Sequence, residues 1–204
     1  MGSMRPPGLS RGQGGALMIE VLVTIVILAI GLLGLMQMQG RLQKSEVESY
    51  QRTQAILLVN DMASRIESNR ANAGDYVIGD PNSPTHFADP TPIGGVGVDC
   101  TVAGPTMAAA DVAEWCNALQ GAAEEQVATS TKVGALLGAR GCVHGVDDGS
   151  EFMVTVAWQG LTPVSEPPEG VACGKLSYDD GSDCVNDLCR RYVTTILRLG
   201  SLPP

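Results

Sequence analysis

Few side chains in this sequence have types and spacing that suggest chemistry, and the most unusual is a single carboxylate. Glu20 stands directly before Val21–Gly40, a stretch without a charged side chain. An apolar run of this length is enough for a helix across a bilayer core of roughly 30 Å. A carboxylate at the border of hydrocarbon is costly and usually functional. The alternative is a flanking charge whose carboxylate reaches the water at the interface.

The residues before this carboxylate indicate a processing site. Gly14 and Gly15 precede Ala16, and the segment before them contains Arg5 and Arg11 but no acidic residue. Positive charge keeps a flanking segment on the cytoplasmic side of a membrane. An ordinary secretory signal has a shorter apolar core, and its small-residue cleavage site follows that core. Here the small residues come first, so cleavage would leave the apolar helix on the mature chain.

The combination of Gly15, the apolar tetrad Ala16–Ile19 and Glu20 resembles the class III signal of type IV prepilins. In that family a prepilin peptidase cleaves after the glycine and methylates the new N-terminus. The resemblance therefore implies cleavage between Gly15 and Ala16 and N-methylation of Ala16. It also implies an assembly role for Glu20, which would pair with the N-terminal amine of a neighbouring subunit. Ala16 departs from the family's usual phenylalanine at the first mature position.

Two further stretches, Ile19–Val23 and Ile30–Leu35, resemble the minor pilins called PilV, or type IV pilus modification proteins. The similarity in motif covers residues 14–40, and the remainder agrees in layout. This resemblance implies a noncatalytic subunit that aids pilus assembly and pilus-dependent adhesion or twitching motility. The chain would first be a single-pass inner-membrane protein with a cytoplasmic N-terminus and later part of the pilus at the cell surface. Its implied partners are the prepilin peptidase, other minor and major pilins, and a pilus-tip adhesin.

Three alternatives stay open: a minor pseudopilin of a type II secretion system, a DNA-uptake pilus subunit and an anchored periplasmic enzyme. The formal charge of the chain is −9, and it becomes about −11 when the two leader arginines are removed. Such an acidic chain is a poor nonspecific DNA binder, so we expect no nucleic-acid partner. Arg190, Arg191 and Arg198 could still form a local basic patch, although such arginines usually form a solvated face or pair with nearby acids.

All six cysteines follow the apolar run, on the side that the charge rule places outside the cytoplasm. An oxidising periplasm favours their pairing as disulfides, and six cysteines allow fifteen pairings, so the connectivity stays open. Cys142 and His144 could instead contribute to a zinc site, but the C-x-x-C spacing of structural zinc modules is missing. The disulfide candidates are Cys100, Cys116, Cys142, Cys173, Cys184 and Cys189.

The remaining polar residues predict neither catalysis nor a cofactor. His86 lies in a proline-flanked loop and His144 in a predicted strand, and no nucleophile stands at a suggestive spacing from a base. The acidic turn Asp179–Asp183 offers oxygen ligands for calcium but lacks the pattern of an EF-hand loop. We therefore expect a solvated turn, and we predict that the chain is not an enzyme.

The elements that must position these residues predict an α+β fold of the type IV pilin kind. After a leader at 1–15, residues 16 to about 73 contain no proline and read as one helix of roughly 85 Å. Residues 16–40 would cross the membrane, and residues 41–74 would continue as an amphipathic helix until Gly74 ends it in a left-handed cap. The proposed core-facing residues share i, i+4 spacing, with three further apolar residues beside them: Tyr50, Gln54, Leu58, Met62 and Ile66, and next to these Val47, Ala55 and Val59.

Three glycines interrupt the apolar helix, at positions 31, 34 and 40. Each lowers helix propensity by about 1 kcal/mol relative to alanine. They would allow close helix packing or local melting of the helix, although glycine is also common in membrane helices generally.

Residues 75–204 are predicted to form a globular head outside the cytoplasm. An irregular connection over 75–105 leads into a short helix at Met107–Leu119, with Trp115 as a core anchor. A hairpin follows, with strands at 142–146 and 152–158, a turn at 147–150, and one buried face on the second strand. An open loop over 160–183 then precedes a closing strand at 191–199. The result is a small antiparallel sheet with disulfide-braced loops, packed on the C-terminal half of the long helix.

Overall fold

The structure, a computed structural model, describes residues 14–78, 100, 104–121, 125–126, 131–132, 136–146, 150–179, 181 and 183–200, with only the backbone of 14–17, 125–126 and 131–132. Contacts within the chain divide it into two compact units, residues 1–45 and 46–204. Most of the predicted leader, the predicted turn at 147–149 and His86 lie outside the described residues.

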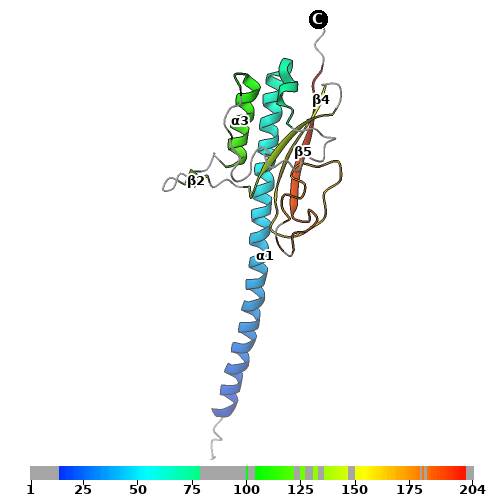
Figure 1. The fold of residues 1–204 in the computed structure, drawn as a ribbon. Helices are drawn as coiled ribbons and strands as arrows, with labels where there is room; N and C mark the ends of the chain where they lie inside the picture. The colour runs from blue at the N-terminus through cyan, green and yellow to red at the C-terminus, as the bar shows by residue number, and fades with distance from the viewer. Residues whose placement is uncertain are drawn as a thin grey trace, which may run out of the picture. The chain divides into compact units, whose positions relative to one another are not determined.

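The first helix, α1, extends over Gly14–Ser68, which confirms a long apolar helix near the N-terminus (Figure 1). Its first part is apolar and free of proline, so intrahelical hydrogen bonds satisfy the backbone wherever water is absent. By length and composition α1 could cross a membrane, and none of its most apolar stretch is buried within the chain. The first unit therefore has no core of its own among the described residues.

The end of α1 differs from the prediction. The helix stops at Ser68 rather than near Ala73, and the 3-10 helix η1 (Arg70–Tyr76) follows. Gly74 lies inside η1 and has no positive φ, so the predicted left-handed cap is wrong. The break comes earlier, at Asn69, whose φ of −118° and ψ of 41° are not helical.

Asparagine side chains and one buried tyrosine explain the early break. The Asn72 amide donates to the Asn69 side-chain oxygen at 2.8 Å, so both asparagines make local bonds that compete with a helix. The amide of Asn69 also donates to the Tyr76 hydroxyl at 3.2 Å, and Tyr76 is fully buried. Tertiary anchoring of Tyr76 therefore turns the chain before Gly74 is reached.

The buried face of α1 in the second unit is centred on Ala55, Val59, Met62 and Ile66, each at most 1% exposed. The predicted i, i+4 series is correct for Met62 and Ile66, but Tyr50 remains 47% exposed. Four residues turn a helix by about 40° more than a full circle, so a long i, i+4 series drifts around the surface. The packed stripe therefore combines i+3 and i+4 steps.

The second helix, α3, spans Met107–Leu119, as predicted. The Thr106 hydroxyl accepts a hydrogen bond from the Ala109 N–H at 3.2 Å and so caps the first turn. Trp115 is fully buried, and its indole Nε1 donates to the Leu58 carbonyl of α1 at 2.9 Å. The prediction that Trp115 is a core anchor is confirmed.

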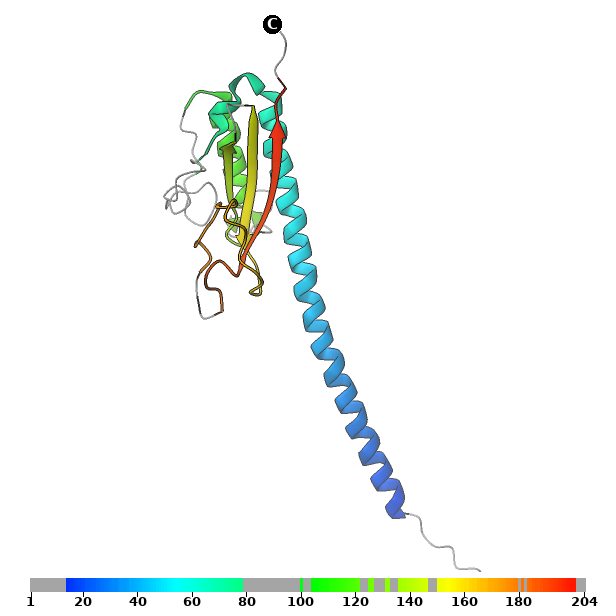
Figure 2. The ribbon, with the colours of Figure 1, turned by 90° about the vertical axis from the view of Figure 1, so that its right-hand side faces the viewer.

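The sheet contains β3 (Arg140–Gly145), β4 (Glu151–Gln159) and β5 (Arg190–Arg198) in that spatial order, and both pairings are antiparallel (Figure 2). These strands confirm the predicted hairpin and closing strand. Two short strands that the sequence did not predict, β1 (Glu125–Gln126) and β2 (Thr131–Lys132), pair separately.

Burial on β4 corrects the prediction of one buried face. Phe152, Val154, Val156 and Trp158 join the core cluster that includes α1 and α3 residues, as expected. The opposite face was predicted to be open, yet Thr155 and Ala157 there are fully buried. The described residues between 160 and 189, here called the strap, cover this outer face, with Cys173 and Tyr178 packed beside Cys142 and Ala157.

Candidate functional site

The largest uncovered feature of the described chain is the apolar part of α1 in the first unit. Every described side chain from Met18 to Ser45 is exposed. The large apolar side chains between Met18 and Met38 are 47–78% exposed. Soluble monomers rarely leave so much contiguous apolar surface in water. This segment therefore needs lipid or another protein around it.

Glu20 is at the N-terminal border of this surface. Its side chain is exposed, and no residue in the described part of the chain forms an ion pair with it. One turn later the Thr24 hydroxyl donates to the Val21 carbonyl at 2.9 Å, so this polar side chain is satisfied within its own helix. If this segment leaves water, the Glu20 carboxylate therefore needs a partner from outside the described part of the chain.

Gly15 and Ala16 lie in the first turn of α1, where the structure describes their helical backbone. The predicted cleavage point therefore lies within the first turn of this helix. The cleavage, the methylation of Ala16 and the assembly role of Glu20 stay predictions.

The glycines of the apolar helix have no packing role inside the chain. A Cβ added at Gly31, Gly34 or Gly40 would find no atom within 4 Å among its non-local neighbours. Glycine destabilises a helix relative to alanine, and no described contact compensates for this at these three positions. Packing within the described fold therefore does not explain these glycines. Helix flexibility or the close approach of another helix would explain them.

In the head, in contrast, a glycine leaves room for the buried side chain of Trp115. A Cβ on Gly141 of β3 would lie 2.2 Å from Cη2 of Trp115 and 2.7 Å from Cδ1 of Leu119. The Trp115 indole therefore packs directly against the backbone of β3 at Gly141. Because the same indole donates to the Leu58 carbonyl, Trp115 connects α1, α3 and the sheet at one point.

A cluster of charges joins α1 to α3 at the surface of the head. Arg65 donates to Asp61 at 3.0 Å and to both Asp111 and Glu114 at 2.9 Å. Burial lowers the pKa of Arg65, but its hydrogen bonds to Glu114 and Asp61 outweigh burial and raise that pKa overall. Burial and then a hydrogen bond to Asp111 raise the pKa of Tyr76. Arg65 is thus charged at all ordinary pH values and bridges the two helices.

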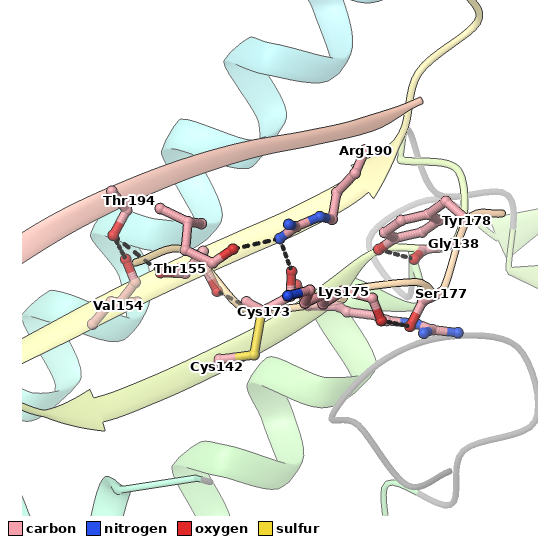
Figure 3. Close-up of a disulfide and its surroundings, with 12 residues drawn as sticks. Gly138, Cys142, Val154, Thr155, Cys173, Lys175, Ser177, Tyr178, Arg190 and Thr194 are labelled. Atoms are coloured by element: carbon pink, nitrogen blue, oxygen red, sulfur yellow. Dashed lines mark hydrogen bonds between the residues drawn. A yellow bond between two sulfur atoms is a disulfide. The ribbon is translucent and has the colours of Figure 1, made fainter. Parts of the chain in front are cut away.

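Three disulfides brace the head, and the sequence left their connectivity open. The bonds are Cys100–Cys116, Cys142–Cys173 and Cys184–Cys189. The second one joins β3 to the strap across a sequence separation of 31 residues (Figure 3). Cys142 therefore cannot supply the thiolate that a zinc site with His144 would need. His144 is buried on β3.

A buried ion pair reinforces this bond from inside the strap. Asp187 and Arg190 are 1% and 3% exposed, and their charged groups lie 3.2 Å apart. Arg190 also donates to the Val171 carbonyl at 2.6 Å and the Cys173 carbonyl at 2.9 Å, the second bond being visible in Figure 3. Asp187 in turn accepts the Leu176 N–H at 2.7 Å. This network holds Val171, Cys173 and Leu176 of the strap over the sheet.

Tyr178 fills the space between the strap and the outer face of the sheet. Its hydroxyl donates to the Gly138 carbonyl at 3.0 Å, and the Arg140 guanidinium carbon lies 5.3 Å from its ring centroid. Burial raises the pKa of Tyr178, while the positive charges of Arg140 and Arg190 oppose this effect. The phenol is therefore a neutral structural donor rather than a nucleophile.

The strap is also tied to α1. Glu48 of α1 lies 3.3 Å from the Arg191 guanidinium and accepts the Leu161 N–H at 3.2 Å. Arg191 further donates to the Thr162 carbonyl at 2.6 Å. The arginines considered for a basic patch thus all face acids: Arg190 meets Asp187, Arg191 meets Glu48, and Arg198 meets Glu151.

The acidic turn of the strap has a structural use. Asp179 accepts the N–H groups of Asn186 at 3.1 Å and Asp187 at 2.8 Å. Across the described ranges, no group of three or more histidine, cysteine or acidic side chains is arranged to hold a metal ion. Asp179 therefore orders the loop around the buried ion pair.

Sequence reasoning missed Glu48, Asp187 and Arg190 as the residues that hold the strap. The pairing of these arginines with nearby acids was one of the three outcomes considered. No local signal identifies which acids are chosen, because Glu48 and Arg191 are joined only by the fold. No protein-family model matches this chain, and no curated protein or solved structure is significantly similar to it.

Proposed function

We propose that this chain is a minor subunit of a type IV pilus. It is inserted in the inner membrane by the apolar part of α1, cleaved after Gly15 and incorporated into the filament. Its work is noncatalytic: it aids the start of assembly and affects adhesion or twitching motility through its partners.

The observation that carries this proposal is an uncovered, charge-free helix surface that begins directly after Glu20. All described side chains of the first unit are exposed, although most of them are apolar. A membrane removes this surface from water before assembly, and neighbouring apolar helices replace the lipid in a filament. Glycines 31, 34 and 40, which no contact among the described residues requires, support close approach of such helices.

Glu20 supplies specificity in this scheme. Cleavage after Gly15 creates an amine four residues away from Glu20, and an amine is the natural partner of a buried carboxylate. Pairing with the amine of an adjacent subunit satisfies both charges, whereas an unpaired carboxylate in hydrocarbon is strongly unfavourable. A helix in the wrong register leaves both groups unpaired, so the pair selects the register of assembly.

The head supports the same proposal from the other side of the membrane. All six cysteines are paired, which suits an oxidising compartment. The strap, the sheet and α3 are held by these disulfides and by buried polar bonds. Such bracing suits a head that presents a binding surface outside the cell.

The decisive experiment expresses the full chain, with variants, in a bacterium that has type IV pili and a prepilin peptidase. The wild-type chain should lose its first fifteen residues, as intact-mass measurement would detect, and appear in sheared pili. Gly15→Leu should retain the leader and stay in the membrane. Glu20→Gln should be cleaved but appear in sheared pili at less than about one tenth of the wild-type amount, since the loss of one buried pair exceeds 1.4 kcal/mol.

Glu67→Gln is the matched control, because Glu67 is an exposed glutamate on α1 in the second unit. It should be cleaved and incorporated like the wild type. An uncleaved wild-type chain, or normal incorporation of Glu20→Gln, would contradict the proposal. The proteins to which the chain can be cross-linked distinguish a pilus from a type II secretion pseudopilus. Cross-links to major pilin would support the pilus, whereas cross-links to secretion pseudopilins alone would contradict it.

A further inference from the structure

The two edges of the three-stranded sheet differ in how many of their backbone groups are hydrogen-bonded. At the β3 edge, the Ile78 N–H donates to the Val143 carbonyl at 2.7 Å, so a crossing segment occupies the middle of that edge. At the β5 edge, the Arg190 N–H donates to the Asp187 carbonyl at 3.0 Å, and from Tyr192 to Arg198 no backbone group in the described part of the chain pairs with the side that faces away from β4. Figure 2 shows β5, in red, as the outermost strand of the sheet.

The hydrogen bonds at the two ends of β5 identify its outward-facing groups. Leu199 donates to Ser150 at 2.8 Å, and Gly160 donates to Cys189 at 2.7 Å. Hydrogen-bonded pairs alternate along an antiparallel ladder, so the odd-numbered residues of β5 bond to β4. The backbone N–H and C=O groups that face outward from the edge belong to Tyr192, Thr194, Ile196 and Arg198.

This edge has little of the usual protection against pairing. Proteins blunt an open edge with charged side chains, proline, a bulge or a very short strand, and two of the three arginines of β5 are largely buried. β5 has nine residues in unbroken register with β4, from Arg190 opposite Gln159 to Arg198 opposite Glu151, and contains neither proline nor lysine. Ile196, in its C-terminal half, is 56% exposed although it is apolar. The strand therefore offers a ready template for a further strand.

We propose that β5 binds an extended segment of another protein as a fourth strand of this sheet, with an acidic residue of that segment beside Arg198. Main-chain hydrogen bonds to the outward groups hold the segment, and alternate side chains select it. Apolar or β-branched side chains of the segment pack on Thr194 and Ile196, which lie on the outer face of β5. The inference depends on the head alone and not on the N-terminal signal.

The charges along β5 determine which kind of segment it binds best. β5 carries three arginines and no acid, within a chain of net charge −9. Two of these arginines are largely buried by their partners, but the Arg198 side chain is 76% exposed beside Glu151. An acidic side chain of the segment would therefore share this exposed guanidinium with Glu151. A second copy would bring another strand without acids and the same net charge, so it is the less favourable occupant.

The probe is a seven-residue blocked peptide that alternates valine and threonine between terminal glutamates. It is titrated into the full chain in detergent micelles, with binding followed by fluorescence anisotropy. Amide hydrogen exchange of residues 190–199 is measured with and without the peptide. We expect saturable binding below about 1 mM, slower exchange at Thr194 and Ile196, and at least tenfold weaker binding of a peptide with terminal lysines.

Two variants test the edge directly. Ile196→Pro removes one outward N–H but no bond to β4, and it should weaken binding by at least about tenfold. Ile196→Thr is the matched control, since it retains the N–H and should bind within about twofold of the wild type. Arg198→Glu should reverse the preference between the glutamate and lysine peptides, and this variant decides the matter if Ile196→Pro fails to fold.

Four results would overturn the proposal. They are no binding of the glutamate peptide up to about 1 mM, binding without protection of the β5 amides, equal preference for both peptides, and a dimer of the chain that protects these amides without peptide. None of these outcomes bears on cleavage after Gly15 or on pilus incorporation.

Discussion

Two stretches of the same helix show how differently one kind of side chain can be used. Between Met18 and Met38, the large apolar side chains of α1 are 47–78% exposed. Between Ala55 and Ile66, the apolar side chains on the packed face are at most 1% exposed. Both stretches are helical and apolar, so helix formation itself does not distinguish them.

The difference lies in what the rest of the chain supplies. The second stretch is covered by α3 and the inner face of the sheet, and disulfides and buried polar bonds keep these elements in place. The first stretch has no covering from the described residues, so its free energy depends on the medium around it. The head should therefore respond to substitutions in folding stability, whereas the uncovered stretch should respond in membrane insertion and assembly.

The largest effect is expected where a buried charge loses its partner. Asp187→Asn keeps a residue that tolerates the positive φ of 60° at this position but leaves Arg190 buried without an opposite charge. The free energy of unfolding of the head should fall by about 3–5 kcal/mol. Chemical unfolding followed by tryptophan fluorescence measures it, because both tryptophans, Trp115 and Trp158, lie in the head.

Asp75→Asn is the control for this prediction, since Asp75 is exposed. It should change stability by less than about 0.5 kcal/mol. Equal stability of the two variants would mean that the buried ion pair does not hold the strap.

The next effect concerns the disulfides of the strap. Replacing Cys142 and Cys173 together by serine should lower the free energy of unfolding by about 2–4 kcal/mol, since the bond closes a separation of 31 residues. Replacing Cys184 and Cys189, which are separated by 5 residues, should cost roughly 1.5 kcal/mol less in the chain-entropy account. Urea titrations of both double variants test this order, and a reversed order would locate the stabilisation in native contacts instead.

A matched pair of glycine substitutions compares the two stretches directly. Gly141→Ala forces a methyl group into Trp115 and should destabilise the head by about 1–3 kcal/mol. Gly34→Ala meets no atom within 4 Å and should leave tryptophan-detected stability unchanged, while raising local helix propensity by about 1 kcal/mol. A loss of head stability in Gly34→Ala would show that the two stretches are coupled.

The smallest effect concerns alkaline pH. Burial raises the pKa of Tyr178 above its ordinary value of 10.0, so above that pH the unfolded chain releases this proton first. The stabilisation is complete below pH 10 and is lost as pH rises toward the higher folded pKa. Thermal melts between pH 9 and 11 should show falling stability, by at most about 1.4 kcal/mol per pH unit for this group.

Tyr178→Phe should reduce this decline while costing roughly 1 kcal/mol at neutral pH, because its hydrogen bond to Gly138 is lost. Tyr192→Phe retains Tyr178 and should keep the decline. An identical pH profile in the Tyr178→Phe variant would remove Tyr178 as its cause.

Some features of this protein follow from the sequence alone because they depend on neighbouring residues. The charge-free run after Glu20 predicts a helix long enough to cross a membrane, and the spacing of apolar residues predicts α3 and the strands β4 and β5. Hydrophobic periodicity reports which face of an element avoids water, and it is written within ten or twenty residues. The possible processing site at Gly15 is local in the same way.

Other features were decided only by the tertiary structure, because they join residues that are distant in sequence. Tyr76 ends α1 early through its burial, and the strap closes the face of β4 that alternation marked as open. The cysteine pairing and the partnership of Glu48 with Arg191 also belong here. Such contacts depend on chain crossings and on competition among many polar partners, and no local pattern encodes which of them is closest once the core has formed.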